Sequence, residues 1–158
     1  MNLDATVITA STRAYKGMYE DKSGPIIAEA LNRLGFLTFG PVVVPDGPMF
    51  AEALREQIAD DRALVITTGG TGINPTDQTP EMTAPLLDKQ IPHLAAAIAR
   101  YGLDHGVPTS ILSRGLAGVA GRTLVINLPG SAGGASDGMQ VLEPVLLHAV
   151  QQVRGGDH

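Results

Sequence analysis

The stretch Val65–Glu81, VITTGGTGINPTDQTPE, combines glycines, hydroxyl side chains and a carboxylate in a pattern suited to binding a phosphate and a metal ion. Gly69, Gly70 and Gly72 lack a Cβ, so the backbone can curl around a ligand and present its N–H groups to an anion. Asp77 follows closely and offers the hard oxygen ligand that Mg²⁺ prefers. The same glycines also suit an ordinary turn, so a plain loop remains the alternative interpretation.

Other polar residues could complete such a site. Asp46 lies in VPDG, where it could be a metal ligand or simply part of a Pro-Asp-Gly turn. Arg114 follows Ser113 and could bind an anion or remain a solvated surface charge. Arg13 and Lys22 are further candidates for neutralising the charge of an anionic ligand.

Several familiar active-site motifs are absent from the sequence. GGTGINP lacks the lysine and the Ser or Thr that follow the glycines of a Walker A loop, and it lacks the third glycine of a dinucleotide-binding fingerprint. Ser131 lies in PGSAG, which is missing the first glycine of a nucleophile elbow. The four histidines do not have the spacing of metal ligands. No cysteine is present, which excludes disulfides and thiolate chemistry.

The composition limits the class of protein. The chain has 158 residues, of which 44% are hydrophobic and 17% charged, as is typical of one globular domain. A net charge of −5 disfavours a general nucleic-acid surface, although it is compatible with a single nucleotide. We expect no membrane span, because no apolar run reaches the length of about 18 residues that one requires. The start MNLDATVITAS resembles neither a basic leader nor a signal-peptide core, and a cytoplasmic protein is expected.

Strand and helix patterns alternate along the chain, which favours an α/β fold with a mostly parallel sheet covered on both faces. One domain is expected over residues 1–154, followed by a loose tail at 155–158. The helix at 82–87 is expected to take Thr79 as its cap, with Glu81 in the first turn. The expected strands are 5–10, 36–44 (broken at Gly40 and Pro41), 63–67, 107–112 and 123–127. The expected helices are 25–34, 49–59, 82–87, 91–101 and 139–153.

Ligands of open α/β sheets bind beyond the carboxyl ends of the strands. LVITTGG at 64–70 and LVINLPG at 124–130 both pass from an aliphatic strand into a glycine turn. STR after the first strand and PDG after the second strand are expected to approach the same rim. The predicted rim comprises Asp46, the 67–77 loop, Ser113, Arg114 and the 127–131 loop.

The combination of motifs resembles a known family. TTGGTG followed by D-x-TPE, SR-x-x-AG and NLPGS, together with YEDKSG and VPD, resembles the molybdopterin adenylyltransferase family, the MogA/MoaB group of molybdenum cofactor biosynthesis. The resemblance implies a three-layer α/β/α molybdopterin-binding fold that assembles as a homotrimer or hexamer. It also implies Mg²⁺-dependent transfer of AMP from ATP to the terminal phosphate of molybdopterin, with release of pyrophosphate. The product would then pass to a protein that inserts molybdate.

The resemblance also assigns site residues. Asp46 and Asp77 match the functional aspartates of the family and would act as Mg²⁺ ligands or orient metal-bound water. The glycine loop would hold phosphates, whereas the later segments would meet the pterin or its phosphate. The expected substrate-binding residues are Ser11, Thr68, Gly69, Gly70, Thr71, Gly72, Thr79, Pro80, Glu81, Ser113, Arg114, Asn127, Pro129, Gly130 and Ser131.

The chain departs from its relatives at three places. Many relatives have SDR where this chain has Ser11-Thr12-Arg13, and many have a glycine and a glutamate where this chain has IPHLAAAIARYG. AGGASDG follows NLPGS in place of a basic or helix-favouring run, and this glycine-rich segment is expected to form a loop. These differences leave a second interpretation open, a non-catalytic oligomeric protein that binds or scaffolds molybdopterin. A third interpretation is a related domain that acts on another nucleotide or pyrophosphate substrate.

Overall fold

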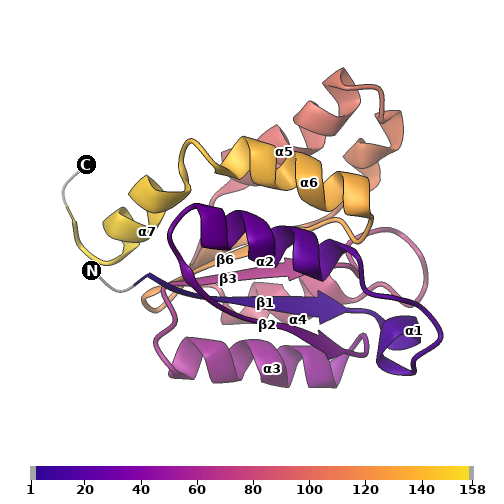
Figure 1. Ribbon diagram of the computed structural model, residues 1–158, viewed down its shortest axis with the longest axis horizontal. Helices are drawn as coiled ribbons and strands as arrows, with labels where there is room; N and C mark the ends of the chain where they lie inside the picture. Colours follow the sequence, from indigo (N-terminus) through magenta and orange to yellow (C-terminus); the bar gives the residue numbers. More distant parts are fainter. Residues whose placement is uncertain (1–2, 157–158) are drawn as a thin grey trace.

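The computed structural model describes residues 3–156 and confirms the three-layer α/β fold with a mostly parallel sheet (Figure 1). The strand order is β2-β1-β3-β6-β5-β4. The first four strands in this order run parallel, and β5 and β4 add antiparallel pairs at one edge. The strands are β1 (Asp4–Ala10), β2 (Leu37–Val44), β3 (Leu64–Thr68), β4 (Lys89–Gln90), β5 (Ala117–Ala120) and β6 (Thr123–Leu128).

Helices form the two outer layers. They are α1 (Thr12–Tyr15), α2 (Ser23–Arg33), α3 (Pro48–Ala59), α4 (Thr79–Thr83), α5 (Pro92–Asp104), α6 (Ala132–Leu142) and α7 (Leu146–Val153), with the 3-10 turns η1 (Ala84–Leu86) and η2 (Pro108–Leu112). Residues of α2, α5, α6 and α7 pack on one face of the sheet, and residues of α3 and α4 pack on the other (Figure 1). Among residues 3–156, no helix is long and apolar enough to cross a membrane.

The central strands alternate between two hydrophobic cores. In β3, Leu64 and Ile66 belong to the core beneath α2, α6 and α7, whereas Val65 packs with Phe50 and Leu54 of α3. This alternation follows from the two-residue period of a strand. Burying each such Leu, Ile or Phe side chain contributes about 1.5–3 kcal/mol relative to leaving it exposed. The two cores hold the parallel strands in place, so that their carboxyl ends meet along one edge.

The prediction of a strand at residues 107–112 is wrong, because Pro108–Leu112 forms the 3-10 turn η2. Pro108 has no N–H to donate to a sheet ladder, and Ile111 and Leu112 are exposed, not buried between layers. The hydroxyl of Ser110 donates to the carbonyl oxygen of Ala99 at 2.6 Å, which holds the turn against α5. Ser113 and Arg114 therefore follow a turn and do not end a strand.

The glycine-spaced segment after Arg114 contains a strand that the sequence did not predict. Ala117–Ala120 pairs antiparallel with β6, and Ala120 lies opposite Thr123 across a two-residue turn. A Cβ on Gly118 would collide with the carbonyl of Lys89, so the glycine lets β4 approach β5 closely. At the opposite edge of the sheet, β2 extends through Gly40 and Pro41, but its pairing with β1 is interrupted there as predicted. Phe39 pairs with Thr6 and Val42 with Ile8, so the register shifts across these two residues.

Two further helix predictions need correction. The expected helix at 139–153 is two helices, since the three residues around Pro144 form a turn between α6 and α7. The glycine-rich segment after Ser131, predicted as a loop, forms the start of α6, and the Ser131 hydroxyl accepts a hydrogen bond from Gly134 N–H at 2.9 Å. A loose tail was expected at 155–158. Within it, the N–H of Gly156 donates to the carbonyl of Gln151 at 2.9 Å, which ties this residue to α7, and residues 157–158 lie outside the described part of the chain.

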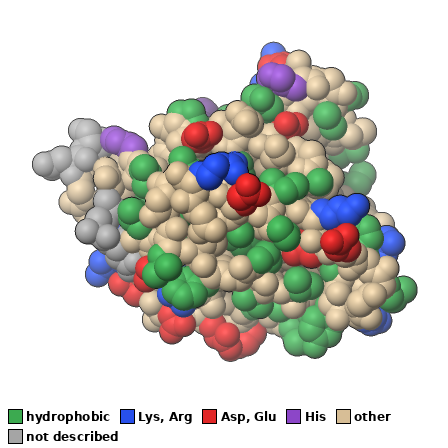
Figure 2. Space-filling model, viewed as in Figure 1, with side chains coloured by type: hydrophobic (Ala, Val, Ile, Leu, Met, Phe, Trp, Pro, Cys, Tyr) green, Lys and Arg blue, Asp and Glu red, His purple; other side chains and the backbone are tan. Residues whose placement is uncertain are grey.

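The helix expected at 82–87 begins earlier than predicted. It starts at Thr79 as α4, and Gln78 occupies the position before it, so Thr79 is not the cap. Glu81 does lie in the first turn, as predicted. On the face seen in Figure 2, Lys and Arg side chains are scattered among acidic, apolar and uncharged groups and do not form one continuous basic patch.

Candidate functional site

The backbone curls sharply at the carboxyl end of β3. Gly69 and Gly70 have φ angles of 93° and 68°, in the left-handed region that glycine adopts without steric cost. A Cβ on Gly69 would meet the carbonyl oxygen of Ala10, and one on Gly70 would lie 2.9 Å from Oδ1 of Asp46. Thr79 secures the turn, because its hydroxyl donates to the Gly69 carbonyl at 2.9 Å and its N–H to the Gly70 carbonyl at 3.0 Å.

Asp46 follows β2 and lies against the start of α1. The Thr12 hydroxyl donates to Oδ2 of Asp46 at 3.0 Å, and the Asp46 N–H donates back to the same hydroxyl at 3.1 Å. The Thr12 N–H adds a longer contact to Oδ2 at 3.4 Å. Ser11 caps α1, since its hydroxyl oxygen accepts from Ala14 N–H at 3.1 Å. Both hydrogen bonds that the Asp46 carboxylate accepts from Thr12 go to Oδ2, while Oδ1 lies on the side of Gly70.

Asp77 is held within a compact loop between Gly72 and α4. The N–H of Asn74 donates to Oδ2 of Asp77 at 3.0 Å, and the N–H of Asp77 donates to the carbonyl of Asn74 at 2.9 Å. The Asn74 side chain accepts from the N–H of Thr76 at 3.1 Å. The orientation of the Asp77 carboxylate therefore depends on the conformation of this loop.

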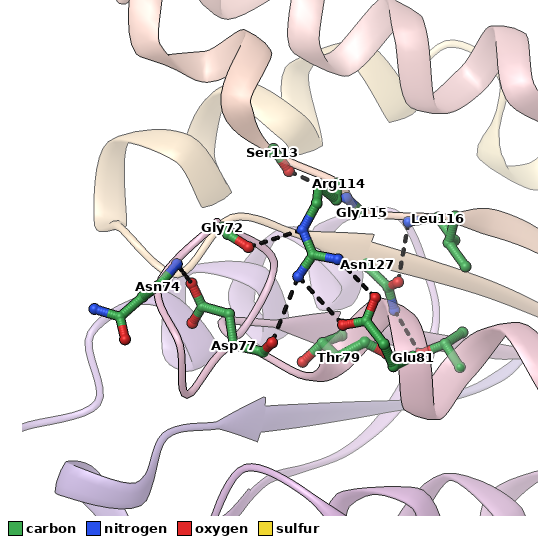
Figure 3. A network of polar contacts seen from close by, with 11 residues as sticks. Gly72, Asn74, Asp77, Thr79, Glu81, Ser113, Arg114, Gly115, Leu116 and Asn127 are labelled. Carbon is green, nitrogen blue, oxygen red and sulfur yellow. Dashed lines mark hydrogen bonds and ion pairs between the residues drawn. The ribbon is translucent and has the colours of Figure 1, made fainter.

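Arg114 lies beside the same loop, and its guanidinium contacts Gly72, Asp77 and Glu81 (Figure 3). Its backbone N–H donates to the carbonyl of Thr71. Its guanidinium makes an ion pair with Glu81, with Nη1 2.6 Å from Oε2. The hydrogen bond from Arg114 holds the pKa of the Glu81 carboxyl below its ordinary value of 4.5. Burial opposes this lowering, and the charge of Arg114 adds to it. The hydrogen bond to Glu81 in turn raises the pKa of Arg114, so both groups are charged at neutral pH.

Two cavities open beside these loops, each of about 440 Å³. Gly70, Asp77 and Gly130 line both, so the cavities meet at the glycine turn and the Asp77 loop. The first is lined further by residues that run from the end of β1 through α1 to the start of α2, and by residues after β2 and β3: Thr9, Ala10, Ser11, Thr12, Arg13, Ala14, Tyr19, Asp21, Lys22, Ser23, Asp46, Gly69 and Thr76. The second is lined further by Thr71, Gly72, Gly102, Val107, Thr109, Ser110, Leu112, Ser113, Pro129, Ser131, Gly133, Gly134 and Asp137.

The two cavities differ in charge. Arg13 and Lys22 line the first, together with three carboxylates. The ionisable groups that line the second are Asp77 and Asp137, and neither a lysine nor an arginine is among its lining residues. The first cavity is thus suited to an anionic ligand, and the second is suited to a group that donates hydrogen bonds.

Most of the predicted site residues line one of these cavities, but six do not. The buried Thr68 hydroxyl donates to the carbonyl of Pro129 at 2.7 Å, and buried Asn127 donates from Nδ2 to the Thr67 hydroxyl at 2.9 Å. Oδ1 of Asn127 accepts from the N–H of Leu116 at 3.0 Å. These polar groups join neighbouring strands and loops beneath the site. The six residues that line neither cavity are Thr68, Thr79, Pro80, Glu81, Arg114 and Asn127.

The sequence did not predict some residues that line the cavities. Asp137 was assigned to a glycine-rich loop, and the start of α6 brings it to the second cavity. Thr12 was expected near the rim as part of STR and was noted as a departure from SDR, but its role as the direct partner of Asp46 was not predicted. The position of Thr12 directly after the first strand was the available signal, because that strand ends at the predicted rim. Residues 93–96, the other noted departure, line neither cavity.

The donor groups fit a magnesium ion that is shared with a ligand. Asp46 and Asp77 both line the first cavity and offer carboxylate oxygens. Within residues 3–156, no group of three or more His, Cys, Asp or Glu side chains is placed to hold a metal. Mg²⁺ is commonly bound by one or two carboxylates together with waters and the phosphates of a substrate. The two aspartates therefore suit Mg²⁺ that arrives with a phosphate ligand, not a metal enclosed by protein.

Comparison with known proteins identifies relatives over nearly the whole chain. Residues 6–148 match the family model described as a probable molybdopterin binding domain. The chain is 37% identical to the molybdopterin adenylyltransferase of Helicobacter pylori J99, over 94% of this chain and 86% of that protein. It is also 37% identical to a molybdenum cofactor biosynthesis bifunctional protein of Synechococcus elongatus, covering 98% of this chain and 48% of that protein. The chain thus spans about half the length of this bifunctional relative.

Solved structures agree with this assignment. The molybdopterin biosynthesis Mog protein of Mycobacterium ulcerans has a TM-score of 0.91 and 54% identity, over 95% of this chain and 98% of that one. The tungsten cofactor synthesizing protein MoaB of Pyrococcus furiosus has a TM-score of 0.87 and 33% identity, over 97% and 98% of the chains. By the family match, the close relatives and the shared fold, this chain belongs to the MogA/MoaB-like family of molybdopterin-binding domains of molybdenum cofactor biosynthesis.

Proposed function

We propose that this protein is an Mg²⁺-dependent molybdopterin adenylyltransferase, which transfers AMP from ATP to the terminal phosphate of molybdopterin and releases pyrophosphate. The proposal is supported by membership of the family and by the name of the Helicobacter relative. The observation that carries it is the junction of the two cavities at Gly70, Asp77 and Gly130. An enzyme that joins two substrates needs two adjoining sites whose reacting ends meet, and this junction supplies them.

The reaction requires positioning and charge stabilisation more than a proton acceptor. An oxygen of the terminal phosphate of molybdopterin forms a bond to the α-phosphorus of ATP, and the bond from that phosphorus to the bridging oxygen breaks as pyrophosphate leaves. The attacking phosphate is already ionised at neutral pH, so no strong base is needed. The backbone N–H of Gly70 would hold a phosphate oxygen, whereas the N–H of Gly69 donates to the carbonyl of Leu128 at 3.1 Å and supports the turn from below.

Asp46 and Asp77 would hold the magnesium ion at this junction. When bound, Mg²⁺ supplies positive charge that stabilises the phosphates during transfer. The carboxylates themselves orient the ion and its waters, and the Thr12 hydroxyl fixes the rotation of Asp46 about its side-chain bonds. Asp77 is fixed by the bonds of its loop to Asn74.

We assign each substrate to one of the two cavities by the charges of the residues that line it. The triphosphate of ATP occupies the first cavity, where Arg13 and Lys22 balance its charge. The pterin occupies the second cavity, where the Asp137 carboxylate accepts hydrogen bonds from its ring N–H groups. The remaining predicted contacts of the second cavity, Ser113, Pro129 and Ser131, surround the pterin or its side chain.

A pyrophosphate-release assay with molybdopterin, ATP and Mg²⁺ tests the proposal. The wild-type protein is expected to release pyrophosphate only when both substrates and Mg²⁺ are present. Asp77→Asn and Asp46→Asn are expected to lower kcat by about 100-fold or more, because each replaces a charged ligand by a neutral amide. A folded wild-type protein that binds molybdopterin without turnover would instead support the non-catalytic pterin-binding alternative.

The proposal also covers the location of the protein, its assembly and the transfer of its product. The protein acts in the cytoplasm as a homotrimer or hexamer and passes the adenylylated product to a protein that inserts molybdate. Support for a joined pathway comes from the Synechococcus relative, which is named bifunctional and is about twice as long as this chain. Light scattering would measure the assembly state, and a monomer in solution would exclude the oligomer.

A further inference from the structure

We infer that Arg114 is a positioning residue, which closes the loop at residues 72–77 and so sets the position of Asp77. The inference rests on the proposed role of Asp77 and extends it to a residue that the sequence placed among the substrate ligands. Arg114 is not among the residues that line either cavity, and its guanidinium nitrogens are directed to protein groups (Figure 3). Arg114 therefore acts through the loop and not on a ligand.

The guanidinium of Arg114 bridges the two ends of the loop. Nε donates to the carbonyl of Gly72 at 2.9 Å, and Nη2 donates to the carbonyl of Asp77 at 3.4 Å. Because the guanidinium is planar and rigid, binding both carbonyls fixes the distance between the two ends of the loop.

Arg114 is itself anchored on two sides. Its backbone N–H donates to the carbonyl of Thr71 at 2.8 Å, just before the loop. Its guanidinium makes two contacts to Glu81 on α4, with Nη1 2.6 Å from Oε2 and Nη2 3.2 Å from Oε1. A two-contact Arg–carboxylate pair has a defined geometry, so Glu81 orients the guanidinium toward the loop. The loop is thus tied to α4 through Arg114.

The loop needs such a restraint because it has little packing of its own. Residues 73–76 are all exposed, and the Ile73 residue is 69% exposed. The bonds that orient Asp77 lie inside the loop, to the N–H and carbonyl of Asn74. If the ends of the loop separate, these internal bonds move with the loop and the Asp77 carboxylate loses its position. Holding the ends is therefore the way in which Arg114 controls the carboxylate.

The restraint is local. The side chains of Arg114 and Glu81 are 38% and 53% exposed, and exposed ion pairs contribute little to the stability of a whole domain. Loss of Arg114 is expected to loosen the loop while the fold remains intact. Loss of Arg114 is therefore expected to speed up hydrogen exchange of the loop amides and to lower kcat, with a small change in Tm.

Hydrogen exchange of the loop amides tests the restraint without any need for enzymatic activity. In Arg114→Met, the amides of Asn74, Thr76 and Asp77 are expected to exchange about tenfold faster than in the wild type. Arg100→Met is the matched control, because Arg100 pairs with Asp104 on the exposed surface of α5, away from the loop. The control is expected to leave exchange at 72–77 unchanged. Unchanged exchange in Arg114→Met would overturn the inference.

Kinetics of the same variants test the consequence for Asp77. Arg114→Met is expected to lower kcat by about 10- to 100-fold, since displacement of a reacting group by about 1 Å costs that much, while KM for both substrates changes less. A raised KM with unchanged kcat would show that Arg114 binds a substrate directly and would overturn the inference. If the wild type has no turnover, the proposed function fails, and the exchange result still decides the role of Arg114.

Two further variants separate bridging from charge pairing. Arg114→Lys keeps the positive charge but cannot reach both carbonyls with a planar group, so it is expected to recover little of the lost kcat. The charge swap Arg114→Glu with Glu81→Arg restores an ion pair but removes the donors to Gly72 and Asp77. It is expected to remain as defective as Arg114→Met. Recovery of kcat and loop protection by the swap would assign the effect to the ion pair alone and contradict the bridging role.

Discussion

The hydroxyl of Thr12 and the carboxylate of Asp46 form a reciprocal pair, in which the hydroxyl donates to Oδ2 at 3.0 Å and accepts from the Asp46 N–H at 3.1 Å. The family resemblance led to the expectation of an acidic residue at the position of Thr12. A threonine here gives Asp46 a neutral donor in place of a second negative charge. The presence of threonine at position 12 therefore affects the orientation of Asp46, a proposed metal ligand.

Removing the Thr12 hydroxyl should impair the reaction while preserving the fold. Thr12→Val keeps the shape of the side chain but loses the bond to a charged acceptor, which is worth about 1.5–3 kcal/mol. We expect kcat/KM to fall about tenfold and the Mg²⁺ concentration for half-maximal activity to rise. Thr12→Ser retains the hydroxyl and is the matched control. Equal activity of Thr12→Val and the wild type would show that Asp46 does not depend on this bond.

The glycine turn should not tolerate a side chain at Gly70. Gly70→Ala places a residue at a φ of 68°, which costs roughly 1–2 kcal/mol, and brings a Cβ to 2.9 Å from Oδ1 of Asp46. We expect Tm to fall by about 3–8 °C and activity to fall about 100-fold. For comparison of stability, Gly133→Ala adds a Cβ with no atom within 4 Å inside α6 and should raise Tm. Calorimetry and the pyrophosphate assay measure both effects.

The pair of Arg114 and Glu81 predicts a pH dependence of stability in the acid range. The pKa of Glu81 is lowered in the folded protein from its ordinary value of 4.5, chiefly by the hydrogen bond from Arg114. A lowered folded pKa contributes stability that is present above the unfolded pKa and is lost as pH falls through the folded value. The Tm difference between wild type and Glu81→Gln should therefore be constant at pH values well above 4.5 and shrink as the pH falls below 4.5. A difference that grows on acidification would reverse this sign.

The assignment of ATP to the first cavity predicts a selective effect on its KM. Arg13→Met and Lys22→Met each remove a cation from the lining of that cavity. We expect each to raise KM for ATP by about tenfold, with a smaller effect on KM for molybdopterin. Arg33→Met, which breaks an exposed pair with Glu29 elsewhere on α2, is the control. A selective rise in KM for molybdopterin would reverse the assignment.

Asp137 offers the corresponding test in the second cavity. Asp137→Asn removes one of the two carboxylate charges from the lining and replaces one acceptor oxygen by a donor, so the pterin loses a hydrogen-bond acceptor. We expect weaker binding of molybdopterin, by about tenfold, with KM for ATP unchanged. Titration of pterin fluorescence measures this affinity directly. Unaltered molybdopterin affinity would place the pterin elsewhere.

The sequence allowed the central strands and their shared rim to be predicted, because their signals are local. Aliphatic runs at 64–66 and 124–126 leave few alternatives to buried parallel strands, and a glycine turn after such a strand indicates a binding edge. The short and irregular elements were harder to predict. Residues 108–112 combine apolar and polar groups without a clear period, and their packing against α5 decided that they form a 3-10 turn.

The sequence by itself determined the α/β class, the glycine turn that follows β3 and the candidate aspartates Asp46 and Asp77, since each rests on residue types and local spacing. Only the tertiary structure separated the residues that line the cavities from those that support them. Arg114 and Asn127 look like ligand-binding residues in the chain, yet their polar atoms are directed to protein groups from distant segments. The physical reason is that a side chain binds whichever partners the fold brings near it, and those partners lie 11 to 60 residues away along the chain.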